Sequence, residues 1–198
     1  LRNFLQIIRR GGTRIDRLVR DFLLLARAEN GSLQQERVAV PTSILPPLNL
    51  ALLEIRAEIE DRGIDLVVDL PETMPLVLAN PDHLRTIIER LLNVTLRFSQ
   101  QTGDALVVQA RTTPDSIVVI FTGEGLPIGE QDLPHIFVPF FVPEHLPLSR
   151  EQHGLGLDLP VVKTLLELYN GRIIVERLAA GNAFAISVPR AEPEINPS

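Results

Sequence analysis

Apolar residues recur at three- and four-residue steps through residues 3–29, and arginines occupy positions between them. This spacing gathers the apolar side chains on one face of a helix, so it predicts a long amphipathic helix over this range. The pair Gly11-Gly12 interrupts the pattern and predicts a kink or poorly formed first turns, because glycine is a weak helix former. Asn30-Gly31 supplies the expected stop.

The remainder of the chain alternates between helical and strand-like patterns. Helical spacing extends over residues 41–63, 80–99 and 158–169, and Asn80 stands where it caps the second of these helices. Together with the strands, these helices predict an α+β fold: a two-layer α/β sandwich with helices on one face of a sheet. Period-two alternation predicts the strands at residues 38–40, 64–70, 76–79, 105–110, 117–121, 172–177 and 183–188.

Composition is that of a folded domain and narrows the classes of partner. The 198 residues, with 45% hydrophobic and 22% charged content, suffice for one medium domain and one extra element. The net charge of −6 disfavours nucleic acid as a main partner, although residues 1–30 hold seven arginines. That basic strip is interpreted as a solvated helix face.

The sequence also bears on cellular location. No apolar run approaches the length of a membrane span, and no signal-peptide pattern is visible. The chain contains no cysteine, which excludes disulfides and thiolate metal sites and favours a cytoplasmic setting. The first residue is Leu1 rather than methionine, so we expect a fragment of a longer chain, such as the cytosolic part of a membrane-anchored sensor, with no membrane contact of its own.

Two glycine clusters carry the strongest functional signal. One is Gly123-Glu124-Gly125 after a predicted strand, and the other, at residues 154–157, opens the helix that follows. Glycines at a strand end or a helix start let the backbone approach a phosphate and direct N–H groups at it. Between the clusters lie a proline, a predicted short helix and the phenylalanine-rich run of residues 136–141. Glycine pairs also mark ordinary turns, so the order of these elements is more specific than either cluster alone.

This order of elements resembles the ATP-binding domain of sensor histidine kinases, which has the Bergerat-type nucleotide-binding fold. Residues 17–31 likewise resemble the second helix of the dimerisation hairpin in that family. The resemblance implies a dimerisation helix over residues 1–31, an ATPase domain over residues 32–190 and a flexible tail over residues 191–198. The first hairpin helix, which carries the phosphoacceptor histidine in the family, finds no counterpart, since all four histidines lie beyond residue 80.

The resemblance also implies ATP and magnesium as cofactors. Arg97 stands where the family has a lysine that reaches phosphate, and Arg150 lies in the loop that covers the nucleotide. For both arginines an ordinary surface position is the alternative interpretation. No catalytic residue and no metal ligand is assigned. The implied nucleotide-binding residues are Arg97, Gly123, Gly125, Arg150, Gly154, Gly156 and Leu157.

Three polar features of the family pattern are changed in this chain. The asparagine pair, whose second member binds magnesium in the family, falls on Arg90 and Val94, and valine offers no oxygen to a hard cation. The aspartate that recognises adenine is replaced by Phe121, which we interpret as a core residue. Asp158 replaces a glycine of the second cluster, where it either repels a triphosphate or serves the first turn of the helix.

A register shifted by one residue would offer Glu89 and Asn93 as the polar pair instead. In the unshifted register, the sequence predicts a histidine-kinase-like region with impaired ATP and magnesium binding, which acts as a pseudokinase-like interaction module in two-component signalling. Its expected partners are a second copy of the chain, through the N-terminal helix, and a response regulator or other signalling protein. The alternatives are an active protein-histidine kinase with a remodelled pocket, and a pocket adapted to another small ligand.

Overall fold

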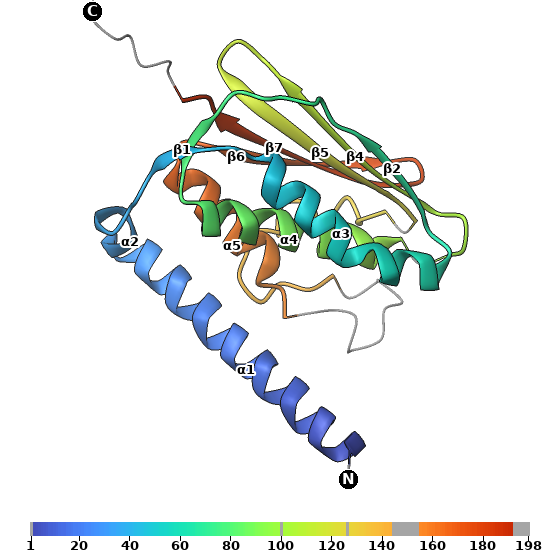
Figure 1. The fold of residues 1–198 in the computed structure, drawn as a ribbon. Coiled ribbons are helices and arrows are strands. Elements are labelled where there is room, and N and C mark those ends of the chain that lie inside the picture. Colours follow the sequence, from blue (N-terminus) through green and yellow to red (C-terminus); the bar gives the residue numbers. More distant parts are fainter. Residues whose placement is uncertain (1, 100, 126, 144–154, 192–198) are drawn as a thin grey trace, which may run out of the picture.

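The computed structural model describes residues 2–99, 101–125, 127–143 and 155–191 of the chain. Helix α1 (Arg2–Glu29) runs beside a two-layer body, to which the short helix α2 (Ser32–Gln35) connects it (Figure 1). We call this body, from residue 40 onward, the sandwich. One of its layers is a sheet, and the other contains helices α3 (Leu45–Arg62), α4 (Pro81–Phe98) and α5 (Asp158–Leu168). The predicted α+β two-layer arrangement is confirmed, and none of the described helices has both the length and the apolar character of a membrane span.

The main sheet has five strands in the spatial order β2-β4-β5-β7-β6. β2 pairs in parallel with β4, and the other neighbours pair antiparallel, which includes both predicted hairpins. A second, two-stranded sheet joins β1 to β3. The strands are β1 (Val40–Thr42), β2 (Asp65–Asp69), β3 (Val77–Ala79), β4 (Ala105–Thr112), β5 (Ser116–Glu124), β6 (Arg172–Leu178) and β7 (Gly181–Pro189).

The core lies between the helix layer and the sheet. Along β5, Ile117, Val119 and Phe121 are fully buried and alternate with partly exposed residues, as expected for a sheet that is covered on one face. Helix α4 lies at the centre of the helix layer, and its predicted apolar stripe is buried throughout. Any ligand site on α4 must therefore use the face of the helix that does not pack into this core. The buried stripe consists of Leu84, Ile87, Ile88, Leu91 and Leu92.

Four local expectations differ from the structure. The helix expected from residue 41 begins at Leu45, because residues 40–42 pair with β3 as strand β1. Helix α1 continues through Gly11-Gly12, because a break would lose several helical hydrogen bonds to avoid a penalty of roughly 1 kcal/mol per glycine. Strand β1 begins at Val40 rather than Val38, where pairing with β3 becomes available. The short helix expected after the first glycine cluster does not form in the described residues 127–143. Successive turns replace it, since Pro134 has no N–H to donate.

The N-terminal cap of α4 gives a direct test of how the sequence specifies this element. The Asn80 side chain accepts hydrogen bonds from the N–H groups of Asp82 at 2.8 Å and His83 at 3.4 Å. We expect Asn80→Ala to lower the free energy of unfolding by about 1 kcal/mol, because these donors lose their acceptor. Asn80→Asp keeps an acceptor and serves as the control in urea denaturation. Equal losses for both variants would contradict the capping role.

Candidate functional site

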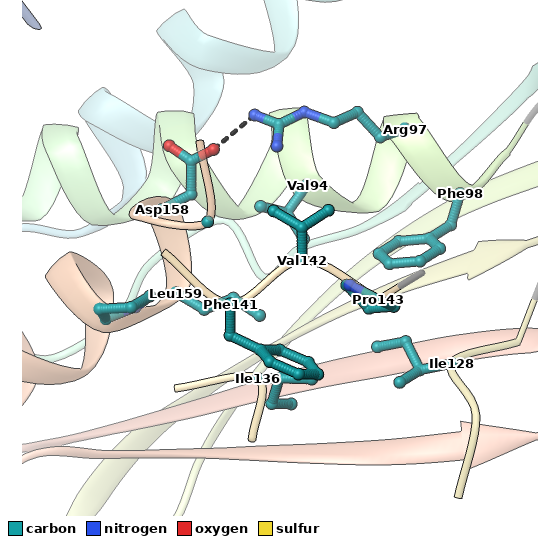
Figure 2. Close-up of a pocket in the computed structure, with 12 residues that line it drawn as sticks. Val94, Arg97, Phe98, Ile128, Ile136, Phe141, Val142, Pro143, Asp158 and Leu159 are labelled. Carbon is teal, nitrogen blue, oxygen red and sulfur yellow. Dashed lines mark hydrogen bonds and ion pairs between the residues drawn. The ribbon is translucent and has the colours of Figure 1, made fainter. Parts of the chain in front are cut away.

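Three side chains of α4 form a stripe that faces the start of α5. Arg90, Val94 and Arg97 are spaced i, i+4 and i+7, which places them on one face of the helix. Both arginines pair with Asp158, the first residue of α5. Figure 2 shows Asp158 and Arg97 directed toward each other above Val94. The fold thus brings four positions together. Three of them, Arg90, Val94 and Asp158, differ from the family pattern, and the fourth, Arg97, keeps the charge of the family's phosphate-binding lysine.

Asp158 is the centre of a set of ion pairs that joins three helices. Its Oδ1 accepts hydrogen bonds from Arg17 of α1 at 2.5 Å and from Arg90 at 3.1 Å, and its Oδ2 accepts one from Arg97 at 2.5 Å. Arg90 also makes a two-pronged contact with Asp21 of α1, at 2.9 and 2.5 Å. We call these five side chains the ion network: Arg17, Asp21, Arg90, Arg97 and Asp158.

Most of the ion network is shielded from water. The side chains of Asp21, Arg90 and Asp158 expose only 8%, 10% and 11% of their surface. Burial by itself raises the pKa of Asp158, but the charges of Arg97, Arg17 and Arg90 and the hydrogen bond from Arg97 outweigh it and hold the pKa below its ordinary value. Asp158 is therefore ionised at neutral pH, and its charge lies at the N-terminal end of α5, where the helix dipole favours an anion.

A small apolar cavity lies beside the ion network. Its volume is about 70 Å³, whereas sites for drug-sized ligands enclose roughly 300–1,000 Å³. Arg97 and Asp158 form its polar edge, and the remaining walls shown in Figure 2 are mainly apolar. The apolar walls include Val94, Phe98, Ile128, Ile136, Phe141, Val142 and Leu159.

Phe121 belongs to the core rather than to this cavity. Its side chain is fully buried on β5, and its neighbours across the sheet are Val108 on β4 and Phe184 on β7. The interpretation of Phe121 as a core residue is therefore confirmed. An aromatic ring that is enclosed in this way offers no acceptor to the amino group of a base.

The described glycines of the two clusters, Gly123, Gly125 and Gly156, have packing roles that involve no ligand. A Cβ atom on Gly125, at φ +135°, would lie 2.1 Å from the carbonyl oxygen of Phe98. A Cβ atom on Gly156, at φ +66°, would lie 2.3 Å from the carbonyl oxygen of Phe141. A Cβ atom on Gly123 would lie 2.8 Å from the side-chain methyl group of Thr95 on α4 and 3.0 Å from the Thr95 carbonyl oxygen. The fold requires these glycines because neighbouring backbone approaches them closely, whether or not phosphate binds.

The predicted nucleotide-binding residues are only partly brought together. Arg97 and Gly156 line the same cavity. Leu157 is buried immediately before α5, where its carbonyl accepts the Val161 N–H at 3.0 Å. Gly123 and Gly125 contact the last turn of α4 and do not line the cavity. Arg150 and Gly154 lie outside the described residues. Residues 192–198 of the predicted tail lie outside them too.

The polar pair of the shifted register faces elsewhere. Glu89 and Asn93 line a groove of about 560 Å³ between α1 and α4, and Asn93 donates to the backbone carbonyl of Glu89 at 2.7 Å. Val94, from the unshifted register, lines the cavity, whereas Glu89 and Asn93 do not. Among the described residues, no group of three or more histidine, aspartate or glutamate side chains is placed to hold a metal ion.

The spacing pattern does not predict Arg17 and Asp21 as site residues. One signal was available: Asp21 interrupts the apolar stripe of α1, with Leu18 and Leu25 one turn away on either side. A carboxylate at such a position needs a cation once the stripe is buried. Its partner Arg90 is 69 positions further along the chain, so only the folded structure identifies it.

Comparisons of the sequence with known proteins identify the family. The family model for the histidine kinase-, DNA gyrase B- and HSP90-like ATPases matches residues 79–192, more than half of the chain. The sensor histidine kinase CusS of Escherichia coli (strain K12) is 30% identical over 179 residues, which cover 89% of this chain and 36% of CusS. The chain therefore spans about a third of the length of this relative.

Solved structures share the fold. Full-length ShkA in complex with AMPPNP has a TM-score of 0.76 at 21% identity, over 96% of this chain and 39% of ShkA. The Acinetobacter baumannii histidine kinase AdeS has a TM-score of 0.73 at 19% identity, over 96% of this chain and 84% of AdeS. With the sandwich, the cavity beside α4 and the matched residues 79–192, the chain belongs to the family of histidine kinase-, DNA gyrase B- and HSP90-like ATPases, as an ATPase domain of the sensor histidine kinase type that helix α1 precedes.

Proposed function

We propose that this chain is the catalytic and dimerisation region of a sensor histidine kinase homologue in two-component signalling, and that its binding of Mg-ATP is impaired or lost. The observation that carries this proposal is the position of Asp158. Its carboxylate pairs with the guanidinium groups of Arg90, which replaces an asparagine of the family pair, and of Arg97, which the resemblance would direct at phosphate. Val94 offers no magnesium ligand, and Phe121 offers no acceptor to adenine.

The retained glycines are the main argument for an active kinase, and their packing roles weaken it. Gly125 and Gly156 are required by close backbone contacts within the sandwich. A chain that had lost nucleotide binding would keep them in order to fold. The glycines therefore support the ATPase fold without supporting ATP binding, and the proposed role is that of an interaction module.

The proposed interaction is a homodimer through α1, with a response regulator or another signalling protein as the further partner. Helix α1 carries an exposed apolar stripe whose spacing of i, i+4, i+7 and i+8 keeps it on one face. Such a face is stabilised when a second helix covers it. The stripe consists of Ile15, Val19, Phe22 and Leu23, which are 65%, 46%, 53% and 53% exposed.

Titration with Mg-ATP tests the proposed loss of nucleotide binding. By calorimetry we expect no saturation below about 1 mM, equivalent to a binding free energy weaker than about −4 kcal/mol. The physical reason is that Asp158 already neutralises the arginines and that two family ligands are missing. Micromolar affinity would support the active-kinase alternative instead.

A restored variant is the matched control for this titration. The substitutions Arg90→Asn, Val94→Asn, Phe121→Asp and Asp158→Gly return the family pattern together, and circular dichroism verifies that the variant is folded. We expect it to bind Mg-ATP more tightly than the native chain. If the folded variant binds no better, the four positions do not account for the loss.

The exposed stripe of α1 predicts the oligomeric state. Light scattering after size exclusion should show a dimer for the whole chain and a monomer for a chain that lacks residues 1–31. Phe22→Glu places a charge in the stripe, and we expect the dimer dissociation constant to rise by about tenfold or more. Arg14→Gln, an exposed change on the same helix, should leave it unchanged. A monomeric native chain at high concentration would contradict the prediction.

A further inference from the structure

We propose that Asp158 acts as a built-in anion that clamps α1 against the sandwich and sets the angle of the helix without any nucleotide. The inference rests on the proposed function, because it assigns the phosphate-side arginines a permanent partner within the chain. The clamp consists of the ion network, in which α1 contributes Arg17 and Asp21, α4 contributes Arg90 and Arg97, and α5 contributes Asp158.

The chemistry around Asp158 is that of an anion site which the protein fills itself. Three guanidinium groups converge on one carboxylate at the N-terminal end of an 11-residue helix. Guanidinium groups and helix N-termini are the groups with which proteins hold phosphate. Since the carboxylate is covalently part of α5, it occupies this position at every nucleotide concentration. Any arrangement of α1 that depends on it is therefore independent of nucleotide.

The ion pairs that Arg17 and Asp21 make with the sandwich lie farther from the C-terminal end of α1 than its apolar core contacts do. The apolar contacts of α1, from Leu24, Leu25 and Ala28, lie near its C-terminal end. Arg17 lies 14 residues before Gly31, which at the helical rise corresponds to about 20 Å. Without the network, the apolar contact near the C-terminal end would have only a short lever arm against rotation of the helix. The network therefore determines the direction in which α1 leaves the sandwich.

The chain has a suitable pivot at the end of α1. Gly31 follows the helix with φ +76°, in the left-handed region. Beyond it, Leu33 is buried and the carbonyl of Val38 accepts a hydrogen bond from the Tyr169 hydroxyl at 3.3 Å. These contacts hold the linker independently of the ion network. Loss of the network should consequently release α1 about Gly31 while the linker stays attached.

Release rather than unfolding is expected, because the two charged side chains of α1 need not remain buried. If Asp158 is neutralised, Arg17 and Asp21 can move into water with α1, which avoids the cost of an unpaired buried charge. The sandwich keeps its own core of residues from α3, α4, α5 and the sheet. While the clamp holds, it also fixes the direction of the exposed stripe of α1 relative to the sandwich.

Distance measurement by electron–electron resonance tests this clamp. The chain contains no cysteine, so Arg14→Cys on α1 and Glu176→Cys on β6 provide two unique positions for spin labels, both of them exposed. Labelled chain is mixed with an excess of unlabelled chain, so that distances within one chain dominate even if α1 dimerises. We expect one narrow distance distribution for the otherwise native chain.

Variants of the network should change that distribution. Asp158→Asn and Asp21→Asn, singly and together, should cause the loss of the single narrow distance and the appearance of longer ones. The matched controls are Asp16→Asn on α1 and Glu167→Gln on α5, whose carboxylates pair, within the described part of the chain, with Arg20 and Lys163 of their own helices. Both controls should keep the native distribution. Thermal unfolding of each variant verifies that the sandwich is intact.

Two outcomes would overturn the clamp: a broad distribution for the native network, or an unchanged narrow one for the folded double variant. Addition of Mg-ATP separates the clamp from the proposed function. The distribution should not respond to Mg-ATP. If Mg-ATP converts a narrow native distribution into the distribution of the Asp158→Asn variant, the clamp stands while the proposed loss of nucleotide binding fails.

Discussion

A carboxylate that is almost excluded from water must be compensated by nearby cations, and at Asp158 this constraint organises the molecule. Arg90 and Arg97 reach it from α4 and Arg17 reaches it from α1. Arg90 also pairs with Asp21, so α1 contributes both a cation, Arg17, and an anion, Asp21, to the ion network. One residue in place of a glycine thus joins a helix outside the sandwich to the two helices that border the cavity.

The same constraint explains how an ATPase fold can persist under the proposed loss of ATP binding. Close backbone contacts maintain Gly125 and Gly156, and burial in the core maintains Phe121. None of these residues needs a nucleotide to be useful. Ligand chemistry resides instead in α4 and at the start of α5, where arginine, valine and aspartate face one another. Fold and ligand binding are therefore carried by largely separate residues, and one can be lost without the other.

Local patterns in the sequence predict the elements of the sandwich well, and distant pairings poorly. The cap at Asn80, the buried stripe of α4 and the inward direction of Phe121 follow from spacing and side-chain chemistry. The turns that replace a short helix near Pro134 depend on how that segment packs, which periodicity does not report. The sequence identifies Asp158 as a departure from the family pattern and predicts either repulsion of phosphate or a role in the first helical turn. Its three arginine partners come from two other helices, and sequence spacing carries no information about them.

An experimental structure of the whole chain, from crystals grown with magnesium and a non-hydrolysable ATP analogue, tests the central claim most directly. The account predicts that the Asp158 carboxylate still bridges Arg90 and Arg97, that Arg17 and Asp21 of α1 remain attached, and that no nucleotide lies beside Val94. A bound nucleotide whose phosphates contact Arg97, with Asp158 turned away from the arginines, would contradict it.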